Sequence, residues 1–139
     1  MSDFELAITL TYNHSMGSLT PYFEGLRKGQ AWAVRCEGCG RVWFAPRLHC
    51  CASEPVTSWL ELAGTGVIAA ATNGTGELPF SEPRPRDAMA LIKMDGAHNQ
   101  VLGWVDGLGK LPEPGTRVRL IAADGAHAHP AQSAVFVAA

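Results

Sequence analysis

All four cysteines of this chain fall within 16 residues, at Cys36, Cys39, Cys50 and Cys51. Cys36 and Cys39 form a C-x-x-C pair, and Gly38 and Gly40 relieve the tight turn that such a pair requires. Two knuckles that each present thiolates from a turn are the usual structural site for tetrahedral zinc. Short alternating runs, AWAVRC and RVWFAP, flank the first turn and predict paired strands. The sequence therefore predicts a rubredoxin-like zinc ribbon over residues 31–57.

The sequence leaves several candidates for the fourth ligand. Cys50 begins the second half-site, but Ser53 stands where a second C-x-x-C would place its last cysteine, and a serine hydroxyl is a poor zinc ligand at neutral pH. Cys51, His49 or water would complete the tetrahedron, although neighbours on an extended chain point in opposite directions. We assign a closed structural zinc site to Cys36, Cys39, Cys50 and Cys51. The alternative is a knuckle held by packing alone, with four reduced thiols.

The composition and the N-terminal sequence indicate whether the cysteines bind a metal or form disulfides. Apolar residues make up 47% of the 139 residues, enough for a core that needs no disulfide staples. Residues 1–15 open with acids and lack the basic region of a secretory signal, and no run approaches the 18 apolar residues of a membrane span. We therefore expect a cytoplasmic protein with no membrane segment, whose cysteines hold a metal or stay reduced.

The rest of the chain predicts one helix and a set of strands. Residues 17–30 are typical of a short helix, with Thr20 as N-cap, Pro21 at the first helical position and Gly29 beyond the end. Its apolar stripe would consist of Tyr22, Phe23 and Leu26. We expect this helix within residues 1–30, the ribbon over 31–57, and a β-barrel over 58–139.

The barrel is predicted from five strand-like runs. Residues 59–74 are expected to form one long strand, with a bulge or sharp coil at Gly64 and Gly66. Residues 88–96 and 100–107 alternate around a turn and predict a hairpin, and residues 116–124 and 133–139 supply two more strands. A mainly β fold with a closed barrel of the OB type fits five such strands. A small sandwich would give a similar pattern.

Three groups of residues follow one another in a distinctive order. They are Arg35, Cys36, Cys39 and Gly40; then Ala45, Pro46, Arg47, Cys50, Cys51 and Ser53; then Trp59, Ala63, Gly64 and Gly66. With the helix before and the strands after, residues 20–123 resemble the acyl-CoA-associated zinc-ribbon/OB-fold family, the domain of unknown function 35 type. Its typical motifs are R-C-x-x-C-G, P-P-R-x-x-C-P-x-C, and Trp followed by S-G-x-G. This chain departs from them at four positions: Ala45, Cys51, Ser53 and Ala63.

The resemblance implies a non-catalytic accessory subunit. Family members accompany thiolase-like enzymes, and the small subunit completes or bridges a site for a CoA thioester in a hetero-oligomer. The residues of this chain are consistent with a non-catalytic role. No serine or cysteine sits in a nucleophile-elbow context, and His98 stands alone in a turn. We therefore expect zinc as cofactor, an acyl-CoA thioester as ligand of the complex, and a thiolase-like catalytic subunit as partner.

Two other functions remain as alternatives. One is a single-stranded nucleic-acid-binding OB module, which would need a positive groove with aromatic platforms. From residue 58 onward, however, six Lys and Arg stand against eight Asp and Glu, so we expect no nucleic-acid partner. The other is a free-standing acyl-CoA-binding protein.

A partner surface should expose apolar side chains. We expect it among five aromatics outside the barrel strands, some of which would instead pack helix and ribbon against the barrel. These are Tyr22, Phe23, Trp43, Phe44 and Phe80.

Overall fold

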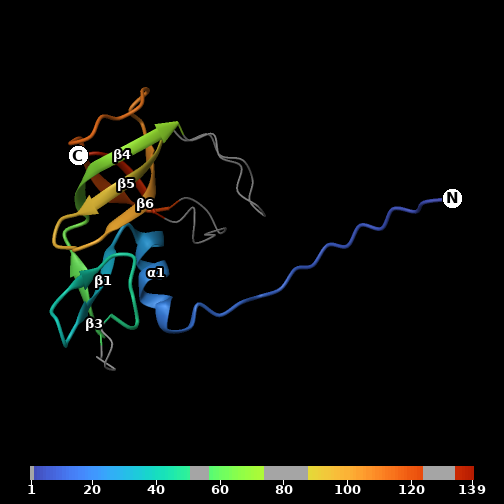
Figure 1. Cartoon of the computed structure of the whole chain (residues 1–139), viewed down its shortest axis with the longest axis horizontal. Coiled ribbons are helices and arrows are strands. Elements are labelled where there is room, and N and C mark those ends of the chain that lie inside the picture. Colours follow the sequence, from blue (N-terminus) through green and yellow to red (C-terminus); the bar gives the residue numbers. More distant parts are fainter. Residues whose placement is uncertain (1, 51–56, 74–87, 124–133) are drawn as a thin grey trace.

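The computed structural model describes residues 2–50, 57–73, 88–123 and 134–139, and Figure 1 shows them as a small sheet with a helix beside it and a barrel above. The first elements along the chain are η1 (Gly17–Leu19), α1 (Thr20–Lys28), β1 (Ala31–Cys36), β2 (Val42–Trp43) and β3 (Thr57–Leu62). The barrel strands are β4 (Thr65–Asn73), β5 (Ala88–Met94), β6 (Gln100–Asp106), β7 (Arg117–Ile121) and β8 (Val135–Ala138). Among the described helices, none has the length and apolar character to cross a bilayer.

The helix forms where it was predicted, with one change at its start. Leu19 occupies the N-cap position, and Thr20 lies inside the helix, where its hydroxyl donates back to the Gly17 carbonyl at 2.6 Å. The predicted cap was therefore wrong by one residue, because the 3-10 turn η1 leads directly into the helix. Gly29 ends the helix at φ 72°, a left-handed conformation that glycine adopts without strain. The predicted stripe is buried: Tyr22, Phe23 and Leu26.

The small sheet, here called the ribbon sheet, has the strand order β2-β1-β3, and both pairs are antiparallel. β3 pairs with β1 from Ala31 opposite Leu62 to Cys36 opposite Thr57. The sequence had assigned residues 59–62 to the first barrel strand, which is wrong. Gly64, at φ 81°, turns the chain from β3 into β4, so the predicted long strand is two strands in two sheets.

The barrel is closed, in the order β4-β5-β6-β8-β7, and β7 pairs back onto β4. β6 and β8 run parallel, whereas the other neighbours are antiparallel. The predicted mainly β fold with a five-stranded OB-like barrel is confirmed, and the sandwich alternative is excluded. The irregularity in β4 lies between Ile68 and Ala70 rather than at the glycines. Residues 74–87 and 124–133 fall outside the described residues, and the division into domains stays a prediction.

Large apolar side chains fill the barrel. Among the fully buried ones are Ile68, Ile92, Val105, Val118 and Phe136. Gly103 on β6 makes room for the Phe136 ring, because a Cβ at this position would lie 2.5 Å from a ring carbon. The barrel core therefore depends on one aromatic ring seated over a glycine.

A turn of the barrel holds the ribbon sheet. His98 and Asn99, between β5 and β6, make four hydrogen bonds to the backbone of β2 and the residue after it. The Val42 N–H donates to His98 Nδ1 at 2.9 Å and the His98 N–H donates to the Val42 carbonyl at 2.8 Å. Asn99 accepts from the Phe44 N–H at 2.9 Å and donates to the Phe44 carbonyl at 2.5 Å. His98, which the sequence left isolated, thus forms half of a clamp between the two sheets.

Candidate metal centre and adjoining pocket

Three thiols meet at one end of the ribbon sheet. Cys36 closes β1, Cys39 lies in the following turn, and Cys50 comes from the segment after β2. Their sulfur atoms all lie within 4.8 Å of one another, and Cys39 Sγ is 3.5 Å from Cys50 Sγ. Zn–S bonds of about 2.3 Å give a tetrahedron whose S–S edges are roughly 3.8 Å. The three cysteines therefore fit three corners of a tetrahedral site for a metal ion such as zinc.

A tight turn brings the first two thiols together. The Cys36 N–H donates to the Arg41 carbonyl at 2.9 Å, and the Gly40 N–H donates to the Cys36 carbonyl at 2.8 Å. Gly40 has φ 72°, which a residue with a side chain rarely adopts. The glycine predicted to relieve the knuckle therefore does so at position 40.

Trp43 contacts the thiol cluster directly. Its indole N–H donates to Cys50 Sγ at 3.1 Å, and the Arg47 guanidinium lies 4.6 Å from the centre of its ring. A hydrogen bond to a ligand sulfur orients that ligand and spreads its negative charge. Sequence reasoning had considered Trp43 only as a partner anchor. The available signal was that a buried indole N–H needs a hydrogen-bond partner, and Cys50 lies seven residues on.

The fourth ligand stays a prediction. Cys51 and Ser53 both lie outside the described residues. His49, the other candidate, is exposed. The described residues therefore establish a three-cysteine group, and the assignment of Cys51 rests on the sequence.

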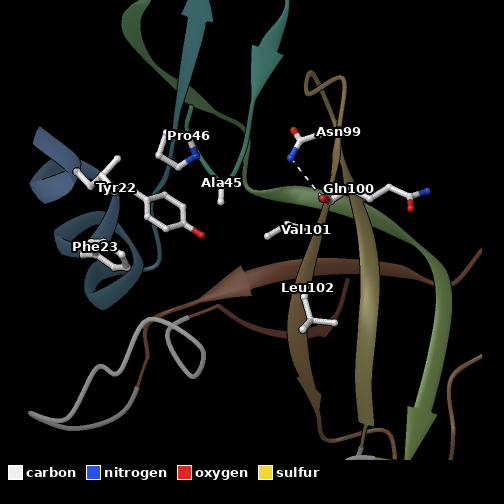
Figure 2. A pocket seen from close by; sticks show the side chains of 9 residues that line it. Tyr22, Phe23, Ala45, Pro46, Asn99, Gln100, Val101 and Leu102 are labelled. Atoms are coloured by element: carbon white, nitrogen blue, oxygen red, sulfur yellow. Dashed lines mark hydrogen bonds between the residues drawn. The ribbon is translucent and has the colours of Figure 1, made fainter. Parts of the chain in front are cut away.

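A pocket of about 390 Å³ lies between α1, the segment after β2 and the start of β6 (Figure 2). Its lining residues are Leu19, Tyr22, Phe23, Ala45, Pro46, Asn99, Gln100, Val101 and Leu102. Figure 2 shows the Tyr22 hydroxyl directed into the space between the helix and β6. Burial raises the pKa of Tyr22 to about 12, so its hydroxyl stays neutral and can donate a hydrogen bond at physiological pH.

A second, smaller hollow of about 210 Å³ adjoins the pocket on the outside of the barrel. It is lined by Ala70, Ala71, Thr72, Met89, Ala90, Leu91 and Leu102. Leu102 lines both hollows and is 57% exposed, and Leu91 is also exposed. The two hollows meet at Leu102, and the surface that they line from α1 across β6 to β4 is here called the apolar face.

The nine described residues that line the pocket include one ionisable side chain, that of Tyr22. Outside the pocket, Asp95 directly after β5 accepts a hydrogen bond from the Thr65 hydroxyl at the start of β4, at 2.5 Å. Arg117 binds the same carboxylate through two nitrogens, at 3.0 and 2.6 Å, and these hydrogen bonds lower the pKa of Asp95 to about 2. That carboxylate is therefore an ion-pair partner and a poor base.

Of the five aromatics that the sequence set outside the barrel strands, three lie in the core, as expected for those that pack helix and ribbon against the barrel. Tyr22, Phe23 and Phe44 are buried, and the Tyr22 ring lies 5.1 Å from that of Phe23 and 5.3 Å from that of Phe44, edge to face. Phe80 lies outside the described residues. Tyr22 is therefore no exposed anchor, and on the described part of the barrel the exposed apolar side chains are leucines instead.

Comparison with solved structures reveals the relationship of this fold. A chain described as "Ltp2-ChsH2(DUF35) aldolase" superposes with a TM-score of 0.62 and 20% identity, over 91% of this chain and 98% of the other. A DUF35 family protein of unknown function from Sulfolobus solfataricus superposes with a TM-score of 0.61 and 16% identity, over 88% and 87%. The structural neighbours are DUF35 proteins. This confirms the resemblance at the level of the fold. No family model and no curated protein matches the sequence.

Proposed function

We propose that this chain is a non-catalytic subunit of a hetero-oligomeric enzyme whose catalytic subunit is thiolase-like and acts on an acyl-CoA thioester. The observation that carries the proposal is the likeness over 98% of the DUF35 chain that is described as part of an Ltp2-ChsH2 aldolase. The sequence motifs shared with the acyl-CoA-associated family point to the same role. The reduced cysteines expected from the sequence support a cytoplasmic location for the complex.

Two features of the structure support an accessory role. Among the described residues that line the pocket, the one ionisable side chain is the neutral phenol of Tyr22, which agrees with a partner that supplies the groups for proton transfer. The apolar face supports a docking role, because the buried core of an interface is more apolar than the rest of a protein surface. In this arrangement the pocket lies at the edge of the interface and can receive part of the thioester.

We further propose that the thiol cluster holds zinc through Cys36, Cys39, Cys50 and Cys51. The spacing of the three described sulfurs and the indole N–H directed at Cys50 support this assignment. A site filled by four cysteines has no open coordination position, so its role is to hold the ribbon sheet together.

Reconstitution tests the accessory role. The purified chain is assayed for thiolysis, hydrolysis and retro-aldol cleavage of CoA thioesters, alone and with a co-expressed thiolase-like subunit encoded beside it. We expect no turnover by the chain alone and turnover by the co-purified complex. Robust turnover by the isolated chain would contradict the proposal, as would failure to co-purify.

A matched pair of variants tests the apolar face. Leu102→Asp places a charge in the centre of the face, whereas Leu111→Asp places the same charge on an exposed leucine that lines neither hollow. We expect Leu102→Asp to weaken co-purification by at least about tenfold, since a buried unpaired charge at an interface is costly. Leu111→Asp should co-purify like the unchanged chain. Equal loss in both variants would remove the face from the proposal.

A further inference from the structure

Residues 2–16 form a segment, here called the arm, that leads away from α1 (Figure 1). Residues 2–15 are all exposed. The large apolar side chains of the arm are 72 to 89% exposed: Phe4, Leu6, Ile8, Leu10 and Tyr12. So many large apolar groups on one short stretch mark a surface that another protein covers.

The order of the arm residues is that of a β-strand. The five apolar side chains occupy every second position, and between them stand Glu5, Ala7, Thr9 and Thr11. Successive side chains of a strand point to opposite faces, so a strand over the arm has one apolar face and one small or polar face. Aromatic and β-branched residues in such alternation favour strands. The arm has no secondary structure of its own in the described chain, but it has the pattern of an amphipathic strand, which needs a neighbouring edge for its backbone hydrogen bonds.

The described part of the chain offers one open edge of suitable length. The barrel is closed, and β2 has only two residues. β3 has six residues and pairs only with β1, so its other side is an open edge among the described strands. Six arm residues, 6–11, would match it in length.

The surface beside that edge is apolar and incompletely covered. Trp59, Leu60 and Leu62 on β3 are half-buried and pack against the core from its margin. Leu60 lies opposite Ala33 and Leu62 opposite Ala31 across the β1–β3 pair, so these four side chains share one face of the ribbon sheet. A strand added beyond β3 with its apolar face on that side extends the same apolar layer.

We propose that the arm of one copy adds as an antiparallel strand to the open edge of β3 in a second copy, and that the exchange is reciprocal. A second copy is the occupant that brings both the amphipathic strand and the matching edge, and reciprocal pairing gives a closed two-fold dimer. The five side chains carry on the order of 700 Å² of apolar surface per arm, and two arms reach the range of a standard stable interface. The dimer does not depend on the catalytic partner.

The first test compares the two faces of the arm in the full-length protein. Leu6→Ser with Ile8→Ser removes apolar side chains from the apolar face, and Ala7→Ser with Thr9→Ser makes the same kind of change on the other face. Molecular mass is measured by sedimentation equilibrium from about 1 to 100 µM. We expect a dimer for the unchanged chain and for the second variant, and a rise in the dimer Kd of at least about 100-fold for the first.

The second test locates the arm by hydrogen exchange. In the dimer, the amides of residues 4–12 and those on the open side of β3 should be protected, and both sets should lose protection together in the variant Leu6→Ser with Ile8→Ser. A monomer at all concentrations overturns the proposal, as does a dimer that survives deletion of residues 2–13. An arm that gains protection only when a catalytic subunit is added assigns it to that subunit and also overturns the proposal.

Discussion

The barrel closes on itself, whereas the ribbon sheet leaves β2 and β3 as its edges. The barrel interior holds large apolar side chains such as Ile68, Ile92 and Phe136, all fully buried. The buried positions of β1 carry smaller ones: Ala31, Ala33, Val34 and Cys36. Small side chains bury little apolar surface, so the ribbon sheet gains less from packing than the barrel does. It needs other attachments, and the structure provides three: α1, the His98–Asn99 clamp and the thiol cluster.

The comparison teaches that one short chain stabilises its two sheets by different means. Burial of apolar area holds the barrel, and that contribution is insensitive to metal and redox conditions. With a metal bound, the thiol cluster would cross-link the ribbon sheet, and that contribution would depend on the metal and on reduced thiols. A change at the thiol cluster should therefore destabilise the ribbon sheet and leave the barrel folded, and a change in the barrel core should do the reverse.

The largest separation is expected from Cys36→Ser. Cys36 is the buried member of the thiol cluster, and serine cannot supply a zinc thiolate. Protein purified without chelator should contain about one zinc per chain, and the variant should contain almost none. Hydrogen exchange should accelerate in β1 and leave β5 protected. Elemental analysis that finds no zinc in the unchanged chain would contradict the metal assignment.

The identity of the fourth ligand can be tested in the same way. Cys51→Ser should lower zinc affinity to nearly the same extent as Cys36→Ser, whereas His49→Ala should leave it unchanged. Trp43→Phe keeps the ring and removes the indole N–H, so it should weaken zinc by about 10- to 100-fold. The three affinities are measured by competition with a chromophoric chelator. Loss of zinc in the His49 variant alone would transfer the ligand assignment to that histidine.

Phe136→Ala is expected to destabilise the barrel and to leave the zinc content unchanged. The Phe136 ring is fully buried over Gly103, and removing it leaves a cavity in the barrel. We expect the free energy of unfolding to fall by about 3–5 kcal/mol, measured in denaturant. Zinc content should stay near one per chain under native conditions. A variant that loses zinc before the barrel unfolds would show that the two sheets are not independent in this way.

A smaller change should loosen the junction itself. Asn99→Ala removes both side-chain hydrogen bonds to the Phe44 backbone. Leaving those backbone groups unpaired should cost about 2 kcal/mol in unfolding free energy. Gln100→Ala, one residue on and exposed, is the matched control and should cost less than about 0.5 kcal/mol. Similar losses in both variants would mean that the clamp contributes nothing specific.

The smallest effect is a dependence on acid. The pKa of Asp95 lies at about 2 in the folded chain, below its ordinary value of 3.8, because Arg117 and Thr65 donate hydrogen bonds to the carboxylate. A lowered pKa contributes stability that is present above pH 3.8 and is lost as the pH falls towards 2. Both side chains of the ion pair are nearly half exposed, so the contribution should be below about 1 kcal/mol. Unfolding of Asp95→Asn should show a weaker pH dependence over this range, with Glu113→Gln as an exposed control.

Much of the fold followed from local patterns. The apolar stripe of α1, the β5–β6 hairpin and the knuckle glycine are each encoded within a few residues, and each was predicted correctly. The sequence predicted the interruption at Gly64, but it assigned both sides to one barrel strand, because a strand pattern does not reveal which sheet a strand joins. Only the pairing of β3 with β1, a long-range contact, settles that assignment.

The candidate site was predictable only in part. The C-x-x-C spacing pointed to the thiol cluster, since the chemistry of a metal site is carried by residue type and spacing. The Trp43 hydrogen bond spans seven residues and could have been suspected from the indole N–H, whereas the His98–Asn99 clamp joins residues about 55 positions apart and no sequence pattern marks it. The partner surface was predicted among five aromatics. Three of them pack the helix and the ribbon sheet instead.

Four consecutive residues connect the metal centre to the pocket. Trp43 binds a thiol, Phe44 is clamped by Asn99, and Ala45 and Pro46 form part of the pocket wall. These four residues are consecutive, so a displacement at the thiol cluster would be transmitted along the backbone to the pocket wall, although none of the described thiols lines the pocket.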